Sequence, residues 1–218
     1  PLALSRPMVK SDGTPSPPRT NTNNTDDSPW LVLLDNFITD EEAEHLIKVG
    51  DQQGFERSLE VGEELPDGTH ARIESNIRTS HTAWCHKEDC YEDATISSVV
   101  ARIAEVIKTE TKNIEHLQLI RYAPGQAFHL HSDYVAHHRE LPLGVRLMTF
   151  LIYLNDVEEG GETHFPHSGV LIQPRRGQAS LWSNVLDGDP EEVDARTDHE
   201  GITITKGLKY IASVTIHS

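Results

Sequence analysis

The chain has 218 residues, of which 35 are acidic and 19 basic, and its formal net charge at pH 7 is −16. This length fits one large domain, or one domain with a tail, and it is sufficient to bury a substantial core. The negative charge argues against nucleic acid and anionic membranes as partners. No apolar run in the sequence reaches the length of a membrane-spanning helix, so we expect no membrane contact by this chain.

The first 28 residues predict a flexible arm. They contain the stretch "SDGTPSPPRTNTNNTDDSP", in which Pro, Ser, Thr, Asn and Asp predominate, a composition typical of disordered linkers. The Pro-rich "TPSPP" also suggests that the arm enters the groove of a neighbouring molecule, although an unstructured linker is the better interpretation. The folded domain is expected at residues 29–218.

A strand and two helices are predicted at the start of this domain. The segment "WLVLLDNF", which begins at Trp30, reads as a strand. Thr39 and Glu42 fit a capping box at the start of a helix that Gly54 can end. A second helix is predicted over residues 93–109, because its apolar side chains recur at helical spacing. These side chains are Ile96, Val99, Val100, Ile103 and Ile107.

From Ile114 onward the sequence changes to short apolar runs separated by turn residues. About eight strands are expected there. Two helices followed by such strands favour an α+β, mainly β fold, an antiparallel sandwich or jelly roll with the helices packed on one sheet. The predicted strands are "HLQLIRY", "AFHLH", "RLMTFLIYLN", "THFP", "GVLIQP", "QASLW", "ITI" and "LKYIASVTIH".

The two cysteines, Cys85 and Cys90, lie in "WCHKEDC". A metal site on them would need further close ligands, of which His86 is the obvious one. They can instead close a small disulfide loop in an oxidising compartment, or stay as thiols in the cytosol. "NNT" at residues 23–25 is a glycosylation sequon, a triplet that also arises by chance. We expect the endoplasmic reticulum lumen or secretory pathway, with the cytoplasm as the alternative.

The stretch "RYAPGQAFHLHSDY" places His129, His131 and Asp133 at every second position. In an extended strand these side chains share one face. Two imidazoles and one carboxylate leave other coordination positions open, as non-haem Fe(II) requires for oxygen and a co-substrate. His199 is the candidate third ligand beside His131 and Asp133, since a jelly roll brings distant strands together. His129 is expected to border the pocket; ordinary surface or partly buried histidines are the alternative.

Three motifs in this order resemble the prolyl 4-hydroxylases of the Fe(II)/2-oxoglutarate dioxygenase superfamily. They are "RYAPGQAFHLHSD", "YLNDVEEGGETHFP" and "HEGITITKGLK", and the resemblance covers about residues 30–217. It implies a double-stranded β-helix and assigns residues 29–218 to the catalytic domain. It also implies that His131, Asp133 and His199 bind Fe(II), with 2-oxoglutarate and O2 as co-substrates.

The resemblance extends to the positions around the metal. Lys209 matches the family's lysine for the far carboxylate of 2-oxoglutarate, a contact that is strong when desolvated. Tyr122 and Thr163 match positions that hydrogen-bond the co-substrate through their hydroxyls; a buried structural Tyr and a turn Thr are the alternatives. Arg146 and His217 match residues near the peptide groove.

The activity implied is hydroxylation of proline in a peptide or protein, with release of succinate and CO2 and with ascorbate as reductant. One position departs from the family pattern: Thr215 stands where the last strand usually carries a Trp that lines the substrate site. Trp182 is expected in a core strand and does not replace it. The departure leaves lysine or another side chain open as the target. Two rival interpretations are a zinc-bound structural or hydrolytic jelly roll and a non-catalytic peptide-binding module.

Overall fold

A computed structural model describes residues 29–65, 69–140 and 142–217 of the chain. The predicted N-terminal arm, with its sequon and its Pro-rich stretch, lies outside the described residues.

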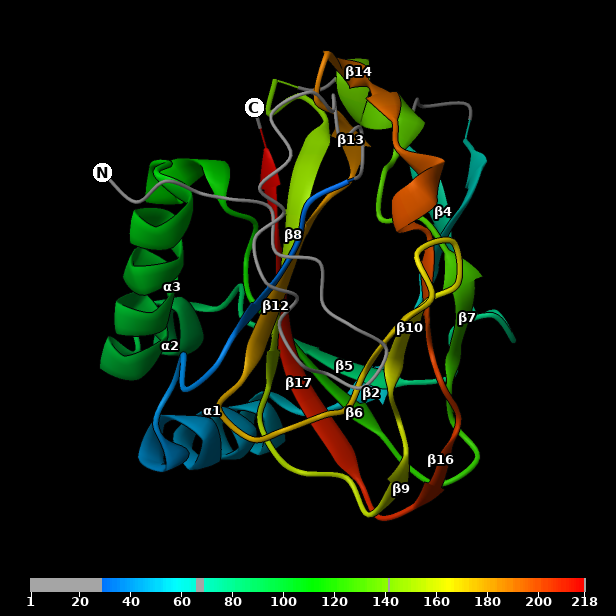
Figure 1. The fold of residues 1–218 in the computed structure, drawn as a ribbon. Helices are drawn as coiled ribbons and strands as arrows, with labels where there is room; N and C mark the ends of the chain where they lie inside the picture. Colours follow the sequence, from blue (N-terminus) through cyan, green and yellow to red (C-terminus); the bar gives the residue numbers. More distant parts are fainter. Residues whose placement is uncertain (1–28, 66–68, 141, 218) are drawn as a thin grey trace, which may run out of the picture.

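Two antiparallel sheets face each other and confirm the predicted mainly β architecture (Figure 1). The larger sheet has seven strands in the order β1-β12-β8-β17-β6-β5-β2, and the smaller has four in the order β11-β10-β15-β7. The strands of the larger sheet are β1 (Leu31–Leu34), β2 (Glu56–Arg57), β5 (His81–Trp84), β6 (Gln118–Tyr122), β8 (Arg146–Tyr153), β12 (Ala179–Ser183) and β17 (Lys209–His217). Those of the smaller sheet are β7 (Phe128–His131), β10 (Thr163–Phe165), β11 (Val170–Ile172) and β15 (His199–Gly201).

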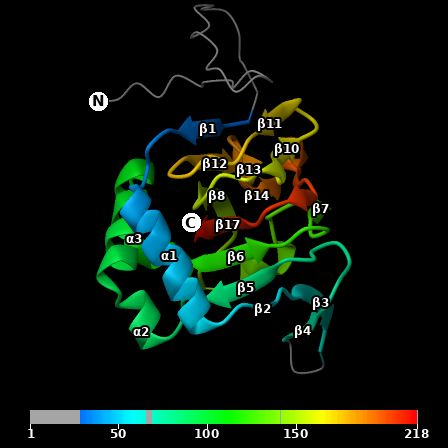
Figure 2. The same ribbon diagram turned by 90° about the horizontal axis from the view of Figure 1, so that it is seen from below.

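Helices cover the outer face of the larger sheet, as predicted, so that this sheet lies between them and the smaller sheet (Figure 2). The first helix begins at Thr39 with both hydrogen bonds of the capping box to Glu42, and it ends at Gly54. The second long helix is capped by Asp93 and ends at Ile107, two residues before the predicted end, because Lys108 adopts a left-handed conformation. Among the described residues, no helix is long and apolar enough to cross a bilayer. The helices are α1 (Asp40–Gln53), α2 (Glu88–Tyr91) and α3 (Ala94–Ile107), with 3-10 turns η1 (Thr111–Asn113), η2 (Ala136–Glu140) and η3 (Ala195–Thr197).

The sequence prediction missed several short strands. The structure places four of them, together with α2, between the two long helices. Segments such as "EVGEE" have no apolar face that alternates with a polar one, so only their partner strands define them as strands. The remaining two-stranded ribbons are β3 (Glu60–Glu64) with β4 (His70–Ile73), β13 (Val185–Leu186) with β14 (Asp189–Val193), and β9 (Glu159–Gly160) with β16 (Ile204–Lys206).

Strand β8 separates two hydrophobic cores. Phe150 and Ile152 pack on the helix side of the larger sheet, whereas Leu151 and Tyr153 pack between the two sheets. Successive side chains of a strand point to opposite faces, and both faces of this strand are covered. The strand therefore reads as a nearly continuous apolar run.

Cys85 and Cys90 form a disulfide that closes the turn between β5 and α2. Both residues are buried in the core on the helix side of the larger sheet. The structure therefore has the disulfide rather than free thiols or a cysteine metal site.

Replacement of Ile103 tests this packing. Ile103 on α3 is fully buried, so Ile103→Ala should lower the free energy of unfolding by about 2–5 kcal/mol. Val106 on the same helix is 41% exposed, and Val106→Ala should change the same quantity by less than about 0.5 kcal/mol. Urea denaturation followed by circular dichroism measures both; equal losses would contradict the placement of α3.

Candidate active site

The pairing of β7 with β15 brings together the three predicted metal ligands. His131 lies directly opposite His199 in this antiparallel pair, and Asp133 follows two residues after the end of β7. His131 Nε2 lies 3.5 Å from Asp133 Oδ1, and His199 Nε2 lies 3.7 Å from Asp133 Oδ2. Residues that are 68 positions apart in the sequence thus present three potential ligand atoms within 4.8 Å of one another.

Both histidines direct the same ring nitrogen toward this centre. His131 Nδ1 hydrogen-bonds the carbonyl oxygen of His129 at 2.8 Å, and His199 Nδ1 hydrogen-bonds that of Thr197 at 3.1 Å. A carbonyl only accepts hydrogen bonds, so each Nδ1 carries the proton and Nε2 of the neutral ring keeps its lone pair. This is the tautomer that a metal ligand needs.

The charges of the three groups also suit a metal. Burial alone would raise the pKa of Asp133, but His199, His131 and a 2.7 Å hydrogen bond from Thr149 lower it well below its usual range. Burial lowers the pKa of His199 to about 4, against the opposing charge of Asp133. At neutral pH the site therefore offers an ionised carboxylate and a neutral imidazole, the protonation states that bind metal ions.

Aromatic rings enclose the two imidazoles. Phe128 stacks on His131, while Phe165 and Trp182 pack against His199 at centroid distances of 5.2 and 4.6 Å. Trp182 is 1% exposed, which confirms its predicted place in a core strand. The rings fix the orientation of the histidines and keep water from their outer faces.

The expectation that His129 borders the pocket is wrong. Two residue steps on β15, from His199 to Gly201, pair with three steps on β7, from His131 to Phe128. The extra residue interrupts the alternation of side chains, as in a β-bulge. Phe128 consequently lines the cavity beside His131, whereas His129 is exposed and contributes its carbonyl oxygen instead.

A cavity of about 390 Å³ extends from the three ligands toward Lys209. Lys209 is 3% exposed and donates a 2.7 Å hydrogen bond to the carbonyl oxygen of Gly161. It makes no ion pair with any carboxylate of the described residues, and burial lowers its pKa to about 7. A buried amine without an anionic partner is costly to keep charged, so this end of the cavity is suited to an anionic ligand.

Two hydroxyls accompany Lys209. Tyr122 lies opposite Lys209 in the pairing of β6 with β17, and burial raises its pKa, so it stays a neutral donor. Thr163 Oγ1 accepts a 2.8 Å hydrogen bond from the hydroxyl of Tyr153, so the Thr163 hydroxyl, which has no acceptor among the described residues, can donate into the cavity that it lines. Gly161 has φ +79°, and a Cβ there would lie 2.5 Å from the Cδ1 atom of Ile204. The turn before Thr163 therefore requires glycine.

The predicted substrate residues, Arg146 and His217, are paired at the end of the larger sheet that lies away from Lys209. Glu115, which the sequence analysis did not single out, accepts hydrogen bonds from Arg146 Nε at 2.7 Å and Nη2 at 2.9 Å. His217 Nε2 lies 2.7 Å from Glu115 Oε1. Burial would raise the pKa of Glu115, but the hydrogen bond from His217 and the charge of Arg146 lower it to about 2. Arg146 also lines the cavity, so Glu115 holds a cation at its wall.

Thr149 is the second residue that sequence reasoning missed. Its hydroxyl is buried and bonds both Asp133 and Asn184. The sequence does contain a signal for this residue, since Thr149 is the one Ser or Thr in the apolar run of β8. Glu115 carries no comparable signal, because it lies in a polar segment before β6.

Fold and site together define a jelly-roll protein with two histidines and one carboxylate in an open cavity. The donor set fits Fe(II), since three ligands on one side leave positions for other molecules. The sequence model of the 2OG-Fe(II) oxygenase superfamily matches residues 117–217. The chain is 32% identical to prolyl 4-hydroxylase 1 of Arabidopsis thaliana over 202 residues, which cover 85% of this chain and 68% of that protein. The chain therefore belongs to the prolyl 4-hydroxylase family within this superfamily.

Two further comparisons give one more sequence relative and one shared fold. Probable prolyl 4-hydroxylase 7 of Arabidopsis thaliana is 29% identical over 209 residues, which cover 87% of this chain but only 63% of that relative. The solved structure of the viral collagen prolyl hydroxylase of Paramecium bursaria Chlorella virus-1, a complex with 2OG, shares the fold. Its TM-score is 0.69 at 24% identity, and the match covers 89% of this chain and 99% of the viral chain.

The hydrogen bond from Thr149 to Asp133 can be tested directly. Thr149→Val removes the hydroxyl while keeping the shape, and it should weaken the affinity for Fe(II) or its substitute Mn(II) about 10–100-fold. Anaerobic calorimetric titration measures the affinity. Thr205→Val, at an exposed position of β16, is the matched control and should leave it unchanged. Equal affinities of the two variants would show that Thr149 does not support the metal ligand.

Proposed function

We propose that this chain hydroxylates proline in a peptide or protein, with Fe(II) as cofactor, 2-oxoglutarate and O2 as co-substrates, and succinate and CO2 as products. One observation carries the proposal: a buried Lys209, without a carboxylate partner among the described residues, lines the same cavity as His131, Asp133 and His199. A cation at one end and open metal positions at the other suit a dicarboxylate with a metal-binding head.

The chain's own residues have distinct roles in this proposal. His131, Asp133 and His199 hold the iron through the two Nε2 atoms and the carboxylate. Bound there, the iron supplies the oxidative chemistry. Lys209 pairs with the far carboxylate of 2-oxoglutarate.

The remaining contacts position the ligand and keep the cavity dry. Tyr122 and Thr163 donate hydrogen bonds to the co-substrate, consistent with a Thr163 hydroxyl that has no acceptor among the described residues. Phe128 and Trp182 keep water from the metal ligands, which strengthens every charge interaction within the cavity.

The peptide would lie at the end of the cavity where Arg146 and His217 meet. Arg146 keeps its orientation through two hydrogen bonds to Glu115, and its planar guanidinium can donate to peptide carbonyl groups. Thr215 also lines this part of the cavity and is 4% exposed. Because Thr215 gives no aromatic surface for a proline ring, hydroxylation of lysine or another side chain is the second candidate.

Two further expectations complete the proposal. Ascorbate would act as the reductant that keeps the iron in its ferrous state. A location in the endoplasmic reticulum lumen or secretory pathway is supported by the disulfide between Cys85 and Cys90, because disulfides persist in oxidising compartments.

The activity is tested by anaerobic loading with Fe(II) and 2-oxoglutarate, followed by oxygen and a panel of proline-rich and lysine-containing peptides. Succinate release and peptide mass are measured together, with Asp133→Ala as the control. The proposal predicts a gain of one oxygen on proline that the variant loses. Succinate without proline oxidation would transfer the activity to another side chain. Absence of 2-oxoglutarate binding would favour a zinc protein or a peptide-binding module.

The pKa of Lys209 predicts how co-substrate binding depends on pH. The free protein has this pKa at about 7, and a bound carboxylate would raise it, so binding takes up a proton above pH 7. The affinity for 2-oxoglutarate should be constant below about pH 7 and fall as the pH rises above it, by up to about tenfold per pH unit. Calorimetric titration between pH 6 and 9 with Mn(II)-loaded protein measures this. Lys209→Met should bind weakly and without this slope; the same slope in that variant would assign the effect to another group.

A further inference from the structure

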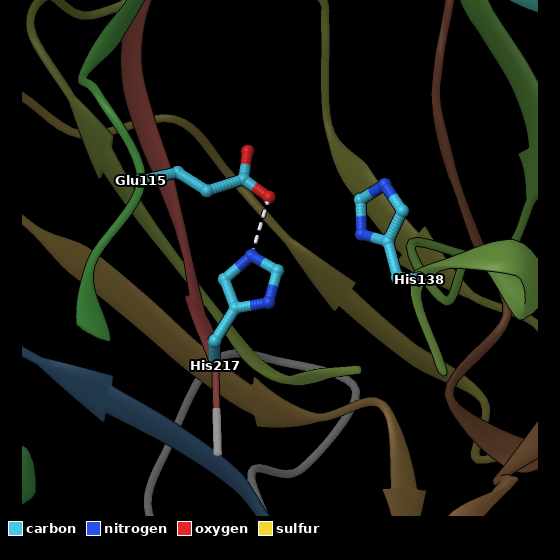
Figure 3. Close-up of side chains that lie close together, drawn as sticks. All are labelled: Glu115, His138 and His217. Carbon is cyan, nitrogen blue, oxygen red and sulfur yellow. Dashed lines mark hydrogen bonds and ion pairs between the residues drawn. The ribbon is translucent and has the colours of Figure 1, made fainter. Parts of the chain in front are cut away.

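A second cluster of potential metal ligands lies apart from the first. Glu115, His138 and His217 each offer a ligand atom, and these atoms lie within 4.8 Å of one another. The residues come from three elements: the segment before β6, the 3-10 turn η2 and the end of β17. Figure 3 shows the three side chains converging from these elements. Two imidazoles and one carboxylate are a ligand set that first-row transition metals prefer.

His138 is incompletely satisfied in this arrangement. Its Nδ1 atom is buried and has no hydrogen-bond partner among the residues that the structure describes. Its ring is turned toward the hydrogen-bonded pair of Glu115 and His217 (Figure 3), and its centroid lies 5.7 Å from that of His217. Buried polar atoms in folded proteins almost always have a partner. The orphaned nitrogen therefore points to a ligand between the three side chains.

We propose that Glu115, His138 and His217 form a second divalent metal site, which takes Zn²⁺ or a similar first-row ion such as Co²⁺. Such an ion would accept the lone pair of His138 Nδ1 and would replace the proton between His217 Nε2 and Glu115 Oε1. Metal–nitrogen bonds of about 2.0–2.1 Å in a tetrahedral site put the ligand atoms about 3.3 Å apart. The three atoms therefore need to draw closer by about 1.5 Å at most, and His138 lies on a short, partly exposed 3-10 turn.

His217 and Glu115 are held by hydrogen bonds of the kind that orient known metal ligands. His217 Nδ1 hydrogen-bonds the carbonyl oxygen of Gly144 at 2.8 Å, which fixes the ring with Nε2 toward the cluster. Arg146 hydrogen-bonds both oxygens of Glu115 and so orients the carboxylate. Partners of this kind commonly hold metal ligands in place.

Arg146 also sets the selectivity of the site. Its positive charge opposes a cation held mainly by charge attraction to the carboxylate, such as Mg²⁺ or Ca²⁺. An ion with strong bonds to imidazole depends less on the carboxylate. An ion reaches the site through a second cavity of about 740 Å³, which Glu115, His138 and Arg146 line.

Occupancy of this site would affect the peptide end of the active site. The ion engages Glu115 and His217, the residues that position Arg146 at the wall of the first cavity. Metal binding would thereby oppose peptide binding without contact with the iron ligands. This consequence rests on the proposed function, whereas the metal site itself does not.

Co²⁺ binding to the full chain tests the site independently of activity. The parent protein carries Asp133→Ala, which disables the first site. Its Co²⁺ complex should show the visible absorption of an ion held by nitrogen and oxygen ligands, with one ion per chain. Adding His138→Gln should remove this absorption and weaken Co²⁺ binding at least about tenfold. Any weak binding by the remaining His131 and His199 is common to all the proteins compared.

His137→Gln in the same parent is the matched control. His137 is the neighbouring residue on the same turn, but it is not one of the three ligands, so this variant should keep both the absorption and the affinity. His138→Ala repeats the comparison with a smaller side chain, and circular dichroism verifies that each variant is folded. Equal Co²⁺ affinity in the His138 and His137 variants, or no binding in the parent, would overturn the proposal.

Discussion

The antiparallel pairing of β7 with β15 is the constraint on which the site depends. This short pair sets His131 opposite His199 and leaves Asp133 within 3.7 Å of both imidazoles. Neither strand is apolar enough to be held by its own burial. Their positions are fixed by the aromatic layer beneath them, in which Phe165 and Trp182 pack against His199, and the core between the sheets therefore serves the chemistry as much as the stability.

Strand β17 connects the two ends of the site. It runs for nine residues from Lys209 to His217, a length of about 27–30 Å at the rise of a β-strand. Its first residue, Lys209, is a buried amine that lines the cavity, and its last residue, His217, joins the network around Arg146. Because the middle of the strand is pinned between β6 and β8, the two functional ends keep a fixed separation.

Both ends of the site contain charged side chains that are partly or fully removed from water, but these charges are balanced in different ways. Within the described part of the chain, Lys209 is buried with one carbonyl oxygen as its hydrogen-bond acceptor, and its pKa falls to about 7, so this position suits an anion. Arg146 and Glu115 already neutralise each other, and the pKa of Glu115 falls to about 2. The charge of Lys209 can therefore be balanced by an anionic ligand, whereas the pair of Arg146 and Glu115 is already balanced and provides an oriented hydrogen-bond donor.

The sequence by itself determined the mainly β fold, the helix cap at Thr39, and the three motifs that point to the candidate metal ligands and Lys209. Helix caps and motif spacings depend on residues close together in the sequence, so they can be recognised without a structure. Tertiary structure decided the features that depend on pairing between distant segments. The extra residue in β7 turns His129 outward and Phe128 inward, and Glu115 gains its role only because β17 and β8 bring His217 and Arg146 to it. A side chain's partner across a sheet is set by register, and register follows from the packing of the whole core rather than from the neighbouring residues.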